Sequence, residues 1–246
     1  MKHVFVILCL GVSTTQLKAQ TVSQTPDGSS NSETESAYTG YVVNNNVPAL
    51  PNSTSGGVTG NPYFSKDWVN GSITTGDNKV ISQDLVFMYN KVDGRLFIKK
   101  SESAIILQAD PAKITSFTLI TDRPHTFMRS DLLGTEYTGK FYEVLVRDEK
   151  KYSFLKLTTS EFEENTTGAA SQVMTVSSSA GSYSDKVKYF IAKEGQLVAV
   201  NLKKKSFESA LAADKDKTDK YFKEHSGSFN EDAAIGLITE INGQVN

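Results

Sequence analysis

Two histidines, His125 and His225, are the side chains beyond the N-terminal segment best suited to acid–base chemistry. His125 lies in "DRPHTFMRSD" with Asp122 and Asp131 nearby, so a carboxylate could orient its ring. A catalytic group of this kind also needs a nucleophile, and the chain has no G-x-S-x-G motif to present a serine. A histidine at a strand edge is more often a surface hydrogen-bonding group, so His125 is kept as a candidate contact residue. His225 ends a predicted helix, where a cation suits the helix dipole.

Metal and cofactor motifs are poorly matched. The stretch "DKDKTDKYFKEH" (214–225) resembles a calcium loop in its spacing, but Asp219 replaces the required glycine and His225 replaces the bidentate glutamate. The chain has no HExxH motif, phosphate-binding glycine loop or dinucleotide-binding glycine pattern. The carboxylates of "EFEEN" (161–165) are explained by a solvated strand end as well as by a hidden glycosidase pair. We predict no catalytic residue, no metal site and no cofactor.

The stretch "GNPYFSKDWVNGSI" (60–73) holds the only tryptophan, Trp68, close to Tyr63 and Phe64. Tyrosine and tryptophan bury a large area while keeping a polar tip, so this cluster could seal a sheet or form a carbohydrate shelf. The first interpretation is favoured, and it predicts that Trp68 is buried in the sheet core. The three aromatic residues remain candidate ligand or partner contacts.

The first 19 residues predict a signal peptide. "MKHVFVILCLGVSTTQLKA" begins with a short basic segment, continues with an apolar run too short to span a bilayer, and ends at the small residue Ala19. No second apolar stretch follows, so we expect no transmembrane segment after cleavage. The protein is expected in the periplasm, on the outer-membrane surface or outside the cell. Cleavage also removes Cys9, the only cysteine.

Residues 20–60 predict a flexible leader, since 26 of the 40 residues from 21 to 60 are Ser, Thr, Asn, Gly or Pro. Its segment "YTGYVV" (38–43) could pair on a sheet edge. Without Lys2 and Lys18, 24 basic side chains remain against 28 acidic ones. This mildly acidic balance argues against a nucleic-acid partner.

Residues 61–202 predict an antiparallel β domain. Hairpin patterns occur at 84–100 around Asp93-Gly94, at 141–159, and at 186–202 around Glu194-Gly195. In the second, Tyr142, Val144 and Val146 alternate with Glu143 as in a half-buried strand. Successive hairpins without helices between them predict a mainly β fold: a meander forming a curved sheet or a partly open barrel. The small polar residues 165–184 predict a long exposed loop.

Residues 203–246 predict a C-terminal helical segment packed on the β domain. Ser206 is the expected N-cap of a first helix, a second precedes His225, and a third runs from Asn230 to a C-cap at Gly243. The apolar stripe of the third helix comprises Ala234, Leu237, Ile238 and Ile241. A short helix must pack on something, either the protein's own sheet or a partner's groove. Leu237 and Ile241 are therefore candidate partner contacts.

A resemblance to a known family supports this architecture. The segments "GNPYFSKDWVNGSI", "LVFMYNKVDGRLFIKK", "ITSFTL" and "FYEVLV" resemble, in this order, the core of a large family of exported proteins from Bacteroidetes. The ending "YFIAKEGQLVAVNLKKKSFESAL", then "DKYFKEHSGSFNEDAAIGLITEIN", is similar to that family's charged helical tail. The resemblance covers about residues 60–243 and implies export and one β-rich domain, without an assigned activity. The long leader and the ending "INGQVN" depart from the pattern.

The leading functional hypothesis is an exported, non-enzymatic envelope protein that acts as a binding or interaction module, with an unknown envelope component or protein as partner. A carrier that encloses a small apolar ligand is an alternative, because the strand at 84–90 is apolar on both faces. A sheet covered on both sides has the same pattern. A hydrolase of the cell envelope is a third hypothesis.

We predict that the protein isolated from its native envelope starts at Gln20, because the apolar run and Ala19 together form a cleavage signal. N-terminal sequencing or intact mass measures this directly. A mature chain that retains residues 1–19 would contradict export by this route.

Overall fold

The structure is a computed structural model that describes residues 58–134, 138–164 and 181–244 of the 246-residue chain. The expected signal peptide (1–19), most of the leader (20–60) and "YTGYVV" lie outside the described residues. All described residues belong to one compact unit. Among them, no helix has both the length and the apolar character needed to cross a membrane.

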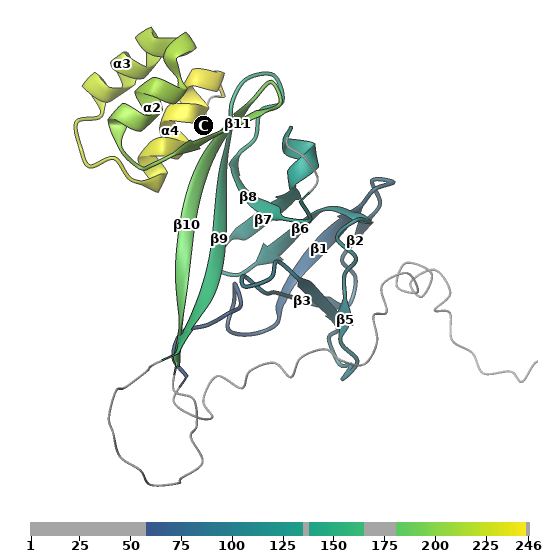
Figure 1. The fold of residues 1–246 in the computed structure, drawn as a ribbon. Helices are drawn as coiled ribbons and strands as arrows, with labels where there is room; N and C mark the ends of the chain where they lie inside the picture. The colour runs from purple at the N-terminus through teal and green to yellow at the C-terminus, as the bar shows by residue number, and fades with distance from the viewer. Residues whose placement is uncertain (1–57, 135–137, 165–180, 245–246) are drawn as a thin grey trace, which may run out of the picture. The chain divides into compact units, whose positions relative to one another are not determined.

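The fold is mainly antiparallel β, as predicted, and the eleven strands of the described residues form one open sheet that does not close into a barrel (Figure 1). The order across the sheet is β11-β10-β9-β8-β7-β6-β1-β3-β4-β5, and β2 pairs with β1. The strands are β1 Val69–Thr75, β2 Val80–Ile81, β3 Leu85–Tyr89, β4 Leu96–Lys100, β5 Leu107–Gln108, β6 Ile114–Ile120, β7 Pro124–Arg129, β8 Phe141–Val146, β9 Ser153–Glu164, β10 Gly181–Lys193 and β11 Gln196–Val200.

All three predicted hairpins are present, as β3–β4, β8–β9 and β10–β11. Gly94 and Gly195 lie at their expected turns with φ of 74° and 78°, a conformation that glycine adopts without strain. The predicted loop over 165–184 is wrong at its end, because Gly181–Ser184 belong to β10 and pair with β9 as far as Glu164. Pairing with a long partner strand outweighs their small, polar composition. Residues 165–180 are not described.

The segment before β1 joins parts of the sheet that are distant in strand order. Thr59 pairs with Ser182 of β10, and Tyr63 pairs with Asn90 just after β3. The Lys91 amide donates to the Pro62 carbonyl (2.8 Å), and the Lys91 ammonium contacts both carboxylate oxygens of Asp185 on β10 (2.8 and 2.6 Å). The aromatic stretch therefore begins the fold and ties β3 to β10.

One face of the sheet, here called the inner face, carries most of the aromatic core. Phe117 of β6 stacks on Phe127 of β7 with ring centres 4.7 Å apart. Tyr89 and Phe141 contact this pair edgewise or tilted, at 5.1–5.2 Å. These rings are buried against one another and fill the space that the curved sheet surrounds.

The helices α2 Lys204–Ala210, α3 Lys215–Glu224 and α4 Glu231–Asn242 lie together beside β9, β10 and β11 (Figure 1). Two short 3-10 helices, η1 Ser130–Leu133 and η2 Ala212–Asp214, complete the elements. The Asn230 side chain accepts from the Ala233 amide (2.9 Å), and Gly243 ends α4 in the left-handed conformation, as expected. Ser206 is not an N-cap. It lies inside α2, and its hydroxyl instead accepts from the Asn201 amide (3.1 Å).

The apolar stripe of α4 packs on the protein's own sheet. Its four side chains are at most 1 % exposed. They share a cluster with Tyr152 and Phe154 of the sheet and Phe207 of α2. The tail thus covers the inner face at the β9–β11 end, and the core continues through it.

We expect Leu237→Ala to lower the free energy of unfolding by about 2–5 kcal/mol, because it leaves a cavity where α4 meets the sheet. Urea unfolding of the mature protein measures this loss. Glu240→Ala, at an exposed position of the same helix, is the control and should change stability by less than about 0.5 kcal/mol. If Leu237→Ala lost as little stability as the control, α4 would not be part of the cooperative core.

Candidate functional site

Tyr63 and Phe64 are sequence neighbours, and their side chains pack on opposite faces of the sheet. Tyr63 is 7 % exposed and packs on the outer face against Met88 and Phe97. Phe64 points to the inner face, with its ring centre 5.0 Å from that of His125 and 5.1 Å from that of Phe127. The structure thus brings two candidate contact residues, Phe64 and His125, together.

The prediction that Trp68 is buried in the sheet core is wrong. Its side chain is half-buried and packs against the small cluster on the outer face of β3–β4. The Lys99 ammonium lies 5.0 Å from the centre of its ring. Because this face carries only a few apolar side chains, the indole has protein on one side and a cation near its ring.

Leu237 and Ile241 are 0 % and 1 % exposed. They offer no surface to a partner of the folded protein, and neither does most of Tyr63. Of the six candidate contact residues, Phe64, Trp68 and His125 remain partly accessible.

His125 of β7 is held between two carboxylates. Its Nδ1 lies 2.7 Å from Glu143 Oε1, and its Nε2 lies 3.3 Å from Asp122 Oδ1. Hydrogen bonds, first from the Thr121 hydroxyl and then from His125, lower the pKa of Asp122 to about 2. Asp131, the other carboxylate near His125 in sequence, is bound by Arg129 instead (2.6 and 2.9 Å).

Glu143 was expected on the polar side of β8, and this expectation is wrong: the residue is 5 % exposed on the inner face. Glu143 does alternate with Tyr142 and Val144, but both faces of β8 are covered: Glu143 shares the inner face with Phe127, and its two neighbours pack in the outer cluster. Glu143 lies directly opposite Lys156 of β9, whose ammonium is 4.0 Å from Glu143 Oε2. Burial is tolerated because two basic groups surround the carboxylate.

The contacts continue from Lys156 to the first turn of α4. The Lys156 ammonium lies 2.9 Å from Glu231 Oε2, and the Tyr189 hydroxyl donates to the same oxygen (2.7 Å). Arg123 lies 3.9 Å from Glu231 Oε1. We call these seven residues the polar row: Asp122, Arg123, His125, Glu143, Lys156, Tyr189 and Glu231.

The electrostatics of the row favour an ionised Glu231. Burial raises the pKa of this carboxyl. The hydrogen bonds from Lys156 and Tyr189, with the charges of Lys156 and Arg123, outweigh burial and lower the pKa below its ordinary value. Burial, followed by the bond to Glu231, raises the pKa of Tyr189. Glu231 also lies in the first turn of α4, where a negative charge complements the helix dipole.

The contacts of the polar row hold α4 against the sheet through Glu231. Glu143 orients the His125 ring as in a catalytic dyad, but the described contacts of that ring are carboxylates and the Phe64 ring, with no serine, threonine or cysteine. Residues 58–134, 138–164 and 181–244 contain no group of three or more potential metal ligands. The row joins the sheet to α4 between the aromatic core and the helical core.

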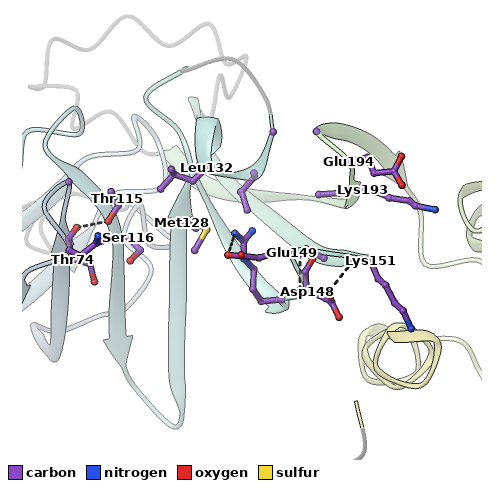
Figure 2. A pocket seen from close by; sticks show the side chains of 18 residues that line it. Thr74, Thr115, Ser116, Met128, Leu132, Asp148, Glu149, Lys151, Lys193 and Glu194 are labelled. Carbon is purple, nitrogen blue, oxygen red and sulfur yellow. Dashed lines mark hydrogen bonds and ion pairs between the residues drawn. The ribbon is translucent and has the colours of Figure 1, made fainter. Parts of the chain in front are cut away.

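An open cavity of about 660 Å³ lies at one end of the opposite, outer face of the sheet (Figure 2). We call it the turn basin, because most of its walls are turns: the β1–β2 turn, η1 with Gly134, the β8–β9 turn at 147–151, and the β10–β11 turn at 193–195. Strand residues that include Thr74, Ser116 and Met128 also line it (Figure 2). Four segments distant in sequence therefore converge on one site.

Charges in the turn basin are balanced and mostly satisfied by neighbours. Arg147, Lys151 and Lys193 oppose three acidic residues, Asp148, Glu149 and Glu194. Arg147 binds Glu149 (3.2 Å), Lys151 donates to the last carbonyls of α4 (3.2 and 2.9 Å), and Lys193 contacts the Tyr152 hydroxyl (3.3 Å).

Two glycines bring η1 close to the β10–β11 turn at the rim of the basin. A Cβ on Gly134 would lie 2.3 Å from the Cα of Gly195, and both residues have positive φ. The sequence marked Gly195 as a turn but contained no motif for the basin, because its residues meet only through strand order.

The chain matches no family model, no curated protein and no solved structure. The resemblance to exported Bacteroidetes proteins remains a prediction from the sequence.

We expect Glu231→Gln to cost about 1 kcal/mol of stability at pH 7, since it removes the charge that meets Lys156 and the helix dipole. The Glu231 pKa is lowered in the folded state, so this stability is present above the ordinary value of 4.5 and is lost as the pH falls through the folded value. The difference between wild type and variant should therefore shrink in urea unfolding below pH 4.5.

Glu240→Gln, at an exposed position near the end of α4, is the control and should show no comparable dependence on pH. If the difference in the free energy of unfolding between wild type and Glu231→Gln stays constant from pH 7 to pH 3, the stabilising role of ionised Glu231 is contradicted.

Proposed function

We propose that the protein is an exported, non-enzymatic binding module of the cell envelope that recognises its partner through the turn basin. The observation that supports this proposal is the convergence of four turns from distant parts of the chain on one open cavity. Turns held on a paired sheet present side chains in fixed positions, and this is how many binding sites are built.

The two alternatives have less support. An apolar carrier needs an empty interior, whereas Phe117, Phe127 and their neighbours pack ring against ring there. A hydrolase needs a nucleophile or an activated water, and the His125–Glu143 pair is enclosed by Phe64 and Asp122 with no such group among its described contacts.

Site-specific photo-crosslinking in cells that make the protein tests the proposal. A benzophenone side chain is placed at Leu132 or Glu149 in the basin, and at Ile105 as control, which is 70 % exposed away from it. We expect the same light-dependent product from both basin positions and not from Ile105. We also expect Ser116→Trp, which fills the basin, to abolish it. Identical products at all three positions, or none at the basin, would overturn the proposal.

A further inference from the structure

We infer that the ligand class of the turn basin is a neutral, hydroxyl-rich glycan, which lies in the basin and along the adjoining outer face of β1, β6 and β7. This inference rests on the proposed function, since it names what the same site binds. It is carried by three features: the charge balance of the basin, a set of free hydroxyls and a mixed apolar and polar lining.

The charge balance disfavours an ionic ligand. Three basic side chains oppose three acidic ones, and the basic groups already have partners in Glu149, the α4 carbonyls and the Tyr152 hydroxyl. A phosphate or a polyanion would have to displace these contacts without an excess of positive charge to attract it. An uncharged ligand that offers both donors and acceptors meets no such cost.

The outer face next to the basin is a band of hydroxyls. Ser72 of β1 lies opposite Thr118 of β6, which lies opposite Thr126 of β7. One step along the strands, Thr74 lies opposite Ser116, which lies opposite Met128 at the basin. Neighbouring strands are about 4.8 Å apart, so the hydroxyls are regularly spaced across the three strands.

Several of these hydroxyls are available. Thr118 and Thr126 bond each other (3.0 Å). In the part of the chain that the structure describes, the hydroxyls of Ser72, Thr74 and Ser116 make no hydrogen bond, and all three residues are half-buried rather than enclosed. A hydroxyl can both donate and accept, so it suits a ligand whose own groups are hydroxyls.

The lining supplies the other contacts that a sugar ring needs. Met128 and Leu132 offer apolar surface to its C–H face (Figure 2). Asn78, Asp148 and Glu149 offer amide and carboxylate groups that bond hydroxyls. A peptide added as an extra strand would need a free strand edge. The basin is bordered by turns, and the array beside it lies on strands paired on both sides, so a peptide is less well matched.

The experiment is affinity electrophoresis of the full mature chain in gels that contain dextran, laminarin, galactomannan or xylan as neutral probes, with polygalacturonate as the acidic probe. We expect at least one neutral glycan to retard the protein, with little effect of salt. The double variant Thr74→Val and Ser116→Ala keeps the shape but removes two free hydroxyls. Its affinity for the glycan should fall by about tenfold or more. Thr159→Val, on the same face but on β9 and away from the basin, should bind as the wild type does.

Three results would overturn the inference: no retardation by any neutral probe, salt-sensitive retardation by polygalacturonate alone, or equal binding by the double variant. The crosslinking experiment distinguishes failure of the glycan inference from failure of the proposed function. A peptide crosslinked at Leu132 and Glu149 without glycan binding would leave a binding module with a protein partner. No basin-specific product and no glycan binding would reject both.

Discussion

Burial of the inner face of one long antiparallel sheet is the constraint on which the other features depend. A single open sheet cannot bury its own face, so separate parts of the chain must cover it. At the β3–β7 end the curvature of the sheet and Phe64 enclose the aromatic core. At the β9–β11 end the three helices do so, with Leu237 and its neighbours against Phe154.

The polar row lies where these two covers meet. Neither the aromatic core nor the helical core extends over Glu143 and Lys156, and the gap is filled by charges that satisfy one another. A buried charge pair contributes little net stability, yet removal of one partner leaves the other uncompensated. The polar row therefore determines the position of α4 on the sheet and contributes less to the net free energy of folding. The ion pair of Lys91 and Asp185 likewise holds the turn after β3 against β10.

The outer face is covered only locally, by Tyr63 and Trp68 over β3–β4 and by Leu133 over β8–β10, because the two large covers lie on the inner face. Its β8–β10 part is apolar, partly covered by Leu133 of η1, while its β1, β6 and β7 part carries hydroxyls. The turn basin forms at the end of this face. Hydroxyl side chains can face water without a cover, and β1, β6 and β7 are each paired with a neighbouring strand on both sides.

The sequence by itself determined what depends on near neighbours. Period-2 patterns and Asp93-Gly94 or Glu194-Gly195 specify hairpins, and Asn230 and Gly243 specify the ends of α4, because turns and caps are decided within a few residues. The tertiary structure alone decided the burial of Glu143, the contact of Phe64 with His125, the partial exposure of Trp68 and the convergence of four turns at the basin. These features follow from strand order, which brings together residues far apart in the chain. The pattern of a single sequence indicates the periodicity of one strand or helix, but it does not indicate which other element that strand or helix packs against.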